Sequence, residues 1–167
     1  VPYPRPGIRL TLTNEKTKNR NQSILFFKNG LEFIKIKTNI PHDSIIDTIY
    51  DQGSKTLYIL DVIKYAGRDL INCDTIFRFF WLQSKFNEDN LRIIDTNEET
   101  QDIKLKLIKS YDMSDHVAVS KCFQSQPPFD NEQTKVDGYL FYHKEADYTI
   151  GSSPLVLWLF PFMIEEV

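Results

Sequence analysis

Residues 136–144 read Val-Asp-Gly-Tyr-Leu-Phe-Tyr-His-Lys, and residues 155–159 read Leu-Val-Leu-Trp-Leu. Between these two apolar, aromatic-rich runs lies a connection that ends in Gly-Ser-Ser-Pro. The pattern predicts two strands of one sheet joined by a loop. Trp158 stands among aliphatic neighbours in the second run, and two interpretations of it stay open. The indole is either a core side chain or a flat platform on which a planar ligand, such as a base, stacks.

Segments upstream of these runs predict further strands, because their apolar residues alternate with polar ones or form short runs between turn signals. The predicted strands are 8–13, 23–27, 31–37, 44–50, 56–64, 92–95 and 103–107. The polar tract 14–22 is predicted to be an exposed connection, and Lys28-Asn29-Gly30 a tight turn. The alternation in 31–37 slips once, at Phe33-Ile34.

Two segments have the spacing of helices rather than strands. Residues 74–87 carry an apolar stripe at helical spacing, with Asp74 or Thr75 as the cap. Phe77 and Trp81 widen this stripe, so we expect a deeply packed helix with Trp81 in the core. A shorter helix is predicted from Ser114 to about residue 124, ended by prolines at 127 and 128. Many antiparallel strands and two packed helices indicate an α+β fold.

Composition predicts one ordinary globular unit over residues 1–167. Of the 167 residues, 41% are apolar and 26% charged, which is enough for a single core. The net charge of −3 argues against binding long nucleic acid through a global basic field, but it allows a small, specific ligand. Signal-peptide and membrane-spanning patterns are absent. The sequence starts without methionine, so we expect a domain excised from a longer chain. Cys73 and Cys122 are predicted to be reduced thiols.

The residues alone predict no catalytic motif, metal site or cofactor site. His42, His116 and His143 lie in different segments without ligand spacing. Three carboxylates on or beside predicted strands are candidates for convergence as a general acid and base, although such groups are usually solvated or paired. They are Asp47, Asp61 and Asp137.

Four collinear blocks resemble the snurportin family, whose members bind the trimethylguanosine cap of spliceosomal small nuclear RNAs. The blocks are 56–68, 77–85, 136–144 and 151–163, with a weaker match at 28–30 and 40–50. The resemblance spans most of the chain. It implies a fold similar to the nucleotide-binding core of messenger-RNA capping enzymes and ATP-dependent ligases.

Those enzymes use the lysine of a K-x-D-G-x-R motif as nucleophile, and the similar stretch here is Pro-Arg-Pro-Gly-Ile-Arg at residues 4–9. Pro4 stands where the family of enzymes has the lysine, and proline has no amine that forms a covalent nucleotide adduct. The resemblance therefore implies a binding domain without catalytic residues.

The resemblance also implies roles for four residues. Trp158 matches the tryptophan on which the cap base stacks, and Arg9 and Lys28 match basic residues near the cap's phosphate bridge. Asn29 is expected to add a polar contact beside Lys28. The loop at 14–22 is longer than in the family, which makes the assignment of Lys28 depend on the alignment there. A segment that precedes residue 1 in the family contacts the methylated edge of the base, and we expect it to be missing here.

The implied partners are a 5′-capped small nuclear RNA or its ribonucleoprotein particle, and importin-beta through a region absent from this chain. An exportin partner stays open, and no membrane is implied. The family's role implies a nuclear import adaptor that shuttles between cytoplasm and nucleus. Two alternatives are kept: an active guanylyltransferase or ligase-like nucleotidyltransferase that uses another lysine, and a degenerate fold retained for protein contacts.

Overall fold

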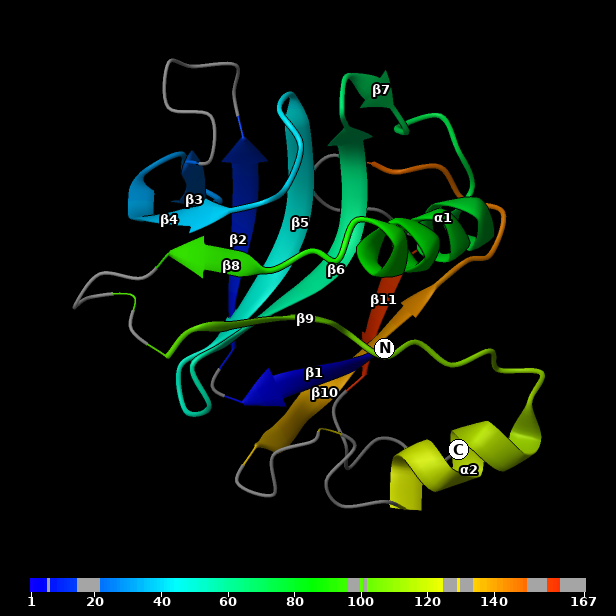
Figure 1. The fold of residues 1–167 in the computed structure, drawn as a ribbon. Coiled ribbons are helices and arrows are strands. Elements are labelled where there is room, and N and C mark those ends of the chain that lie inside the picture. The colour runs from blue at the N-terminus through cyan, green and yellow to red at the C-terminus, as the bar shows by residue number, and fades with distance from the viewer. Residues whose placement is uncertain are drawn as a thin grey trace.

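The structure is a computed structural model that describes residues 1–5, 7–14, 22–95, 100, 102–124, 129, 134–149 and 156–159. These ranges contain two helices and two β-sheets (Figure 1). The strands are β1 (Pro2–Arg5), β2 (Gly7–Asn14), β3 (Gln22–Phe27), β4 (Glu32–Thr38), β5 (Ser44–Asp51), β6 (Thr56–Tyr65), β7 (Arg68–Asp69), β8 (Ile93–Asp95), β9 (Lys104–Leu107), β10 (Lys135–Tyr142) and β11 (Val156–Leu159). The helices are α1 (Thr75–Glu88) and α2 (His116–Gln124). The α+β class predicted from the sequence is confirmed.

The larger sheet has eight strands, with the order β7-β6-β5-β2-β3-β4-β8 and β9 beside β6. All its pairs are antiparallel except β6 with β9. Alternation along the strands gives the sheet one apolar face, where Leu10, Leu12 and Ile46 are fully buried. Helix α1 lies against β6 at one side of the sheet and adds Leu82 to the same core (Figure 1). The seven strands predicted upstream of the opening stretch are confirmed.

The slip in the predicted alternation is a β-bulge. Leu25 pairs with Ile34, but Phe26 pairs with Glu32, so Phe33 is the extra residue of β4. A bulge re-aims the side chains that follow it, which explains why strict alternation fails at this point. The predicted turn that joins β3 and β4 is confirmed, and Gly30 has φ of 85° there.

The smaller sheet has the order β1-β10-β11, and both pairs are antiparallel. The predicted pairing of the two C-terminal runs is confirmed, with Leu140 opposite Trp158. This sheet packs against the second face of the larger sheet, since Leu140 shares a core cluster with Ile49 and Leu60. The partly buried Trp158 packs against the same cluster.

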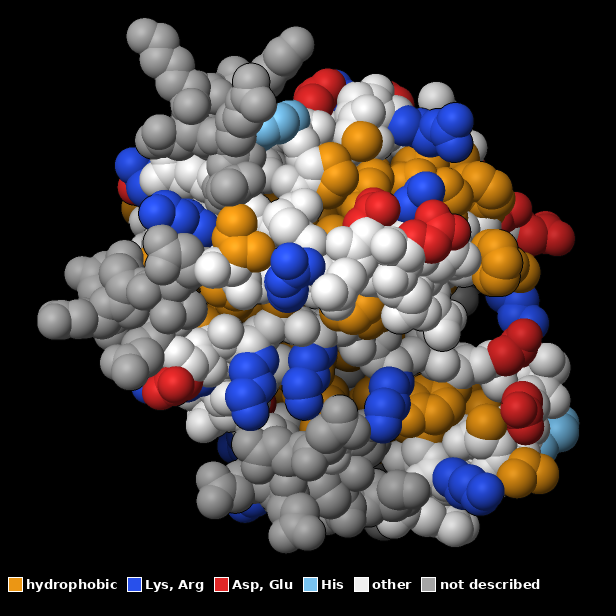
Figure 2. All heavy atoms as spheres, viewed as in Figure 1, with side chains coloured by type: hydrophobic (Ala, Val, Ile, Leu, Met, Phe, Trp, Pro, Cys, Tyr) orange, Lys and Arg blue, Asp and Glu red, His pale blue; other side chains and the backbone are white. Residues whose placement is uncertain are grey.

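Helix α1 begins where predicted, because the Asp74 side chain accepts a hydrogen bond of 2.8 Å from the Phe77 amide. The prediction that this helix is deeply packed is wrong for three of its apolar residues. Ile76, Phe77 and Phe80 are 54%, 45% and 69% exposed, and Figure 2 shows apolar side chains at the surface over α1. Trp81 does pack against the core, with its ring 5.0 Å from that of Tyr65 and nearly perpendicular to it.

Part of the apolar stripe of α1 faces solvent because Arg78 points to the protein interior. Arg78 is 1% exposed and lies four residues, about one turn, before the buried Leu82. Its guanidinium binds Asp61 of β6, so the helix face with Arg78 and Leu82 points to the sheet. The buried ion pair, and not the number of apolar side chains on each face, therefore determines which face of the helix points to the sheet.

The second helix, α2, is capped by Asp115 instead of the predicted Ser114, since the Asp115 side chain accepts from the Ala118 amide at 3.1 Å. The predicted proline stop and residues 15–21 of the predicted loop lie outside the described ranges. Cys73 and Cys122 are free thiols, as predicted. Neither described helix has the length and apolar character to cross a bilayer.

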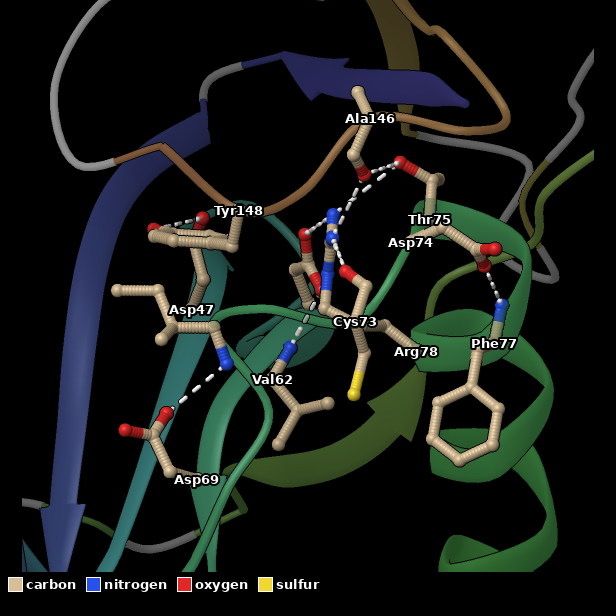
Figure 3. Close-up of polar contacts among 12 residues, drawn as sticks. Asp47, Val62, Asp69, Cys73, Asp74, Thr75, Phe77, Arg78, Ala146 and Tyr148 are labelled. Atoms are coloured by element: carbon tan, nitrogen blue, oxygen red, sulfur yellow. Dashed lines mark hydrogen bonds and ion pairs between the residues drawn. The ribbon is translucent and has the colours of Figure 1, made fainter.

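Arg78 joins three separate parts of the chain, as Figure 3 shows. Nε and Nη2 donate to the two carboxylate oxygens of Asp61 at 2.9 and 3.1 Å. Nη1 donates to the carbonyls of Cys73 at 2.7 Å and Ala146 at 3.1 Å, and Nη2 also donates to Thr75 Oγ1 at 3.3 Å. These five bonds match the five N–H donors of a guanidinium. The buried cation is thus fully satisfied.

Replacing Arg78 by methionine is expected to lower the free energy of unfolding by about 3–5 kcal/mol, because Asp61 becomes a buried carboxylate without its partner. Lys64→Met is the matched control, since it breaks an ion pair of 3.1 Å with Asp43 whose side chains are both partly exposed. That control should change stability little. Urea unfolding followed by circular dichroism measures both. Equal losses in the two variants would show that the buried pair is no more important than a surface pair.

Candidate functional site

The candidate site lies where the second face of the larger sheet meets the smaller sheet. On β2, alternation places Arg9 on the face opposite to Leu10 and Leu12. On β5, Asp47 lies on the same face as Arg9, because it pairs with Thr11, two residues along β2. The smaller sheet brings β10 and β11 over this face through the shared core cluster.

Trp158 is half-buried on β11 and packs against the second core cluster. Its ring lies 5.1 Å from the ring of Tyr3, at an interplanar angle of 81°. Tyr3 comes from β1, so strands from opposite ends of the chain hold the indole. The structure therefore gives Trp158 a packing role on one side, and its stacking on a ligand stays a prediction.

Arg9 is bound by a carboxylate within the protein. Its Nε donates to Asp47 Oδ1 at 2.7 Å, and its Nη2 donates to Oδ2. The Arg9 side chain is 24% exposed and that of Asp47 only 7%. Burial lowers the pKa of Arg9, but the hydrogen bonds and the charge of Asp47 outweigh burial and raise that pKa overall. Arg9 is therefore a fixed cation whose charge Asp47 offsets.

Two tyrosines complete this polar region. The Tyr148 hydroxyl donates to Asp47 Oδ2 at 3.4 Å, and its ring centroid lies 5.6 Å from the guanidinium carbon of Arg78. Tyr142 is on β10, and its ring meets that of Phe79 edge-on at 5.2 Å. Burial is the main cause that raises the pKa of both tyrosines. Their hydroxyls therefore stay protonated near neutral pH, and that of Tyr148 is the donor to Asp47.

The carboxylates proposed to converge do so only in part. Asp47 and Asp61 are opposite each other on β5 and β6. Asp137 lies instead on β10, and its nearest basic group is Arg5 Nε at 3.9 Å. Each of the two convergent carboxylates forms an ion pair with an arginine. This is the paired state that the sequence analysis set against a role as general acid and base. Within the described residues, no three His, Cys, Asp or Glu side chains are grouped as a metal site.

Lys28 and Asn29 lie in the exposed turn between β3 and β4. Phe27 pairs with Leu10, so the turn begins at the level of Arg9 on the neighbouring strand. The Asn29 side-chain oxygen accepts from the Leu31 amide at 3.0 Å, which fixes the turn. The structure thus brings Lys28 and Asn29 to the end of the sheet where Arg9 lies. Trp158 belongs to the other sheet, and Tyr3 links the two parts, since its ring packs on Trp158 and lies against Gly7 of β2. Burial raises the pKa of Tyr3, and the positive charge of Arg9 acts against this rise.

A separate cavity of about 700 Å³ opens between α1, α2 and the end of β10, where Figure 2 shows the surface hollowed. Phe79, Phe80, Phe123 and Tyr142 are among its lining residues. Neither Trp158 nor Arg9 lines it. The cavity therefore shares Tyr142 with the candidate site but contains none of the residues to which the resemblance assigns a role.

Sequence reasoning missed the tyrosines of this site. Tyr142 was detectable, because its even spacing from Gly138 and Leu140 places all three on one face of a strand. Tyr148 had no such signal, since it lies in a connection without periodicity. Tyr3 was undetectable for a different reason: its contact with Trp158 depends on pairing across almost the whole chain.

Comparison with protein families finds a match to the model described as Snurportin1, m3G cap-binding domain, over residues 13–161. The matched range includes Lys28, Asn29 and Trp158, and it begins after Arg9. It covers most of the chain, in agreement with the collinear blocks found in the sequence. Membership implies binding of a trimethylguanosine cap by a domain that is not a known catalytic one. This chain belongs to the snurportin m3G cap-binding domain family.

Proposed function

We propose that this domain holds the trimethylguanosine cap at the junction of its two sheets, with the cap base stacked on Trp158. The observation that carries the proposal is the half-buried indole, held in place by Tyr3 at the edge of the second core cluster. A large aromatic ring that is anchored yet partly exposed suits a planar ligand better than a fully buried one does.

The chemistry of the cap strengthens this pairing. Methylation at N7 gives the guanine a positive charge, and a cation is attracted to the electron-rich face of an indole. Stacking of a base on an aromatic side chain contributes about 1–3 kcal/mol. A single well-placed tryptophan therefore accounts for a large part of the affinity for so small a ligand.

We assign the cap's phosphate bridge to Lys28 and Arg9, with Asn29 beside them. Lys28 is exposed in its turn and offers a full positive charge. Arg9 uses Nε and Nη2 for Asp47, so its Nη1 is the group that we expect to donate to a phosphate oxygen. The Asn29 side-chain oxygen is engaged in the turn, which leaves its Nδ2 for the ligand.

We also propose that the fold is related to the nucleotide-binding core of capping enzymes and ligases, without their chemistry. The support is an arrangement of two sheets that face each other, together with Pro4 at the position of the enzymes' lysine. Pro4 is buried in β1 opposite Val136. A proline there supplies packing and no nucleophile. Residues 1–167 act as one domain in this proposal, because β1 completes the same sheet as β10 and β11.

In the cell, the proposed role is that of a nuclear import adaptor for capped small nuclear RNA, which shuttles between cytoplasm and nucleus. Importin-beta would engage a region outside this chain, and an exportin is a second candidate partner. These assignments rest on the family, since only cap binding follows from the domain itself.

Trp158→Ala is expected to weaken binding of a trimethylguanosine dinucleotide cap analogue by about 1–3 kcal/mol, because the stacking platform is lost. Trp81→Phe is the control, since Trp81 packs against Tyr65 in the other core cluster. It should leave cap affinity unchanged. Isothermal titration calorimetry measures both, and unchanged affinity in Trp158→Ala would refute the stacking role.

A parallel incubation with labelled GTP and ATP tests the enzymatic alternative, and a covalent adduct would support it.

Lys28→Ala is expected to weaken cap binding about threefold to tenfold at low salt, because a charge-assisted contact to phosphate is removed. The loss should shrink as ionic strength rises. Lys35→Ala is the matched control, because Lys35 is an exposed lysine of the adjoining strand β4, with Glu32 at 3.6 Å. It removes the same charge from the surface. Equal effects of the two variants would mean that only overall charge matters and that Lys28 makes no specific contact.

A further inference from the structure

We infer that Gly138 and Tyr3 are positioning residues that fix the plane of the Trp158 indole for the cap base. This inference rests on the proposed stacking and adds to it the features of the chain that orient the ring. Gly138 has no role in the proposal above, where Tyr3 enters only as a packing partner of the indole, and Tyr3 precedes the range matched by the family.

Gly138 lies directly under the indole. A Cβ built on Gly138 would lie 2.3 Å from Trp158 Cζ2, 2.6 Å from Cε2 and 2.8 Å from Cη2. Because the two ring neighbours of Cζ2 are almost as close as Cζ2 itself, this Cβ would lie over the face of the ring rather than beyond its edge. The indole therefore rests flat on the bare backbone of β10. Any side chain at position 138 would push it away.

The register of the smaller sheet explains this overlap. Trp158 is opposite Leu140, so Gly138 is the next residue of β10 on the same face. Gly138 is in turn opposite Tyr3 of β1. The indole thus extends diagonally across β10 from one edge strand toward the other, where the Tyr3 ring meets it nearly at right angles.

A second glycine makes room for Tyr3. A Cβ on Gly7 would lie 2.7 Å from Tyr3 Cε1 and 2.6 Å from the carbonyl oxygen of Pro4. Gly138 of the smaller sheet therefore leaves space for the Trp158 ring, and Gly7 of the larger sheet leaves space for the Tyr3 ring. A ring held on one face by backbone and on another side by a perpendicular ring has lost most of its rotamer freedom before the ligand arrives, which favours affinity.

The test compares cap affinity in Gly138→Ala and in Val136→Ala, a shortened side chain of the same strand and the same core cluster. Gly138→Ala should weaken binding of the trimethylguanosine dinucleotide about tenfold, because the tilted indole no longer stacks. Val136→Ala should lose stability without losing affinity. Near-ultraviolet circular dichroism of Trp158, in a Trp81→Phe background that leaves it as the single tryptophan, should change only in Gly138→Ala.

A smaller ring should relieve the clash. Trp158→Phe should weaken cap binding in the natural background and strengthen it in the Gly138→Ala background. This reversal of sign is not expected of a residue that only supports the fold. If Gly138→Ala alone does not fold, recovery of folding and binding in the double variant supports the inference, and failure of the double variant overturns it.

The two hypotheses fail in different ways. Unchanged affinity in Trp158→Ala refutes the proposed stacking and, with it, this inference. Weakened affinity in Trp158→Ala together with unchanged affinity and an unchanged Trp158 spectrum in Gly138→Ala overturns the positioning role alone.

Discussion

The buried pair of Arg78 and Asp61 is the constraint on which the arrangement of this domain depends. A guanidinium in the protein interior is costly unless every donor is matched, and here β6, the start of α1 and the connection after β10 supply the acceptors. Moving any of these three parts would leave buried guanidinium donors without acceptors. The pair therefore fixes the rotation of α1 and holds the connection that leads to β11. The helix, the larger sheet and the connection after β10 meet at this one side chain.

A second arginine–carboxylate pair lies beside the first. Asp47 and Asp61 are cross-strand neighbours, so two negative charges lie close together. Each carboxylate is neutralised by an ion pair with a different arginine. Tyr148 links the two pairs, since its hydroxyl donates to Asp47 and its ring lies over Arg78. The two pairs thus form a polar, nearly neutral group of fixed geometry beside the apolar cluster between the sheets. Such a region suits a small ligand with both a cationic base and anionic phosphates better than a strongly basic surface does.

The strands were predictable because alternation and turn residues are local signals, and even the bulge at Phe33 was visible as a slip. The rotation of α1 was not, because an apolar count cannot detect that Arg78 has a buried partner on β6. The parallel pairing of β9 and the contact of Tyr3 with Trp158 were equally hidden, since both depend on residues distant in sequence. For the candidate site, the strand pattern could not decide whether Trp158 is a core side chain or a stacking platform for a ligand. The family resemblance supplied the expected roles of Trp158, Arg9, Lys28 and Asn29, which stay predictions.

The smaller sheet has a consequence for how the protein is made. Val1 and Leu140 exchange backbone hydrogen bonds across a separation of 139 residues, and β11 follows later still. Contacts of such long range form late, because loop closure must precede them. During synthesis, Tyr3 leaves the ribosome long before the strand that carries Trp158. The aromatic pair therefore exists only once translation has passed the end of β11, so the platform proposed for the cap base is not available to a capped RNA before that point.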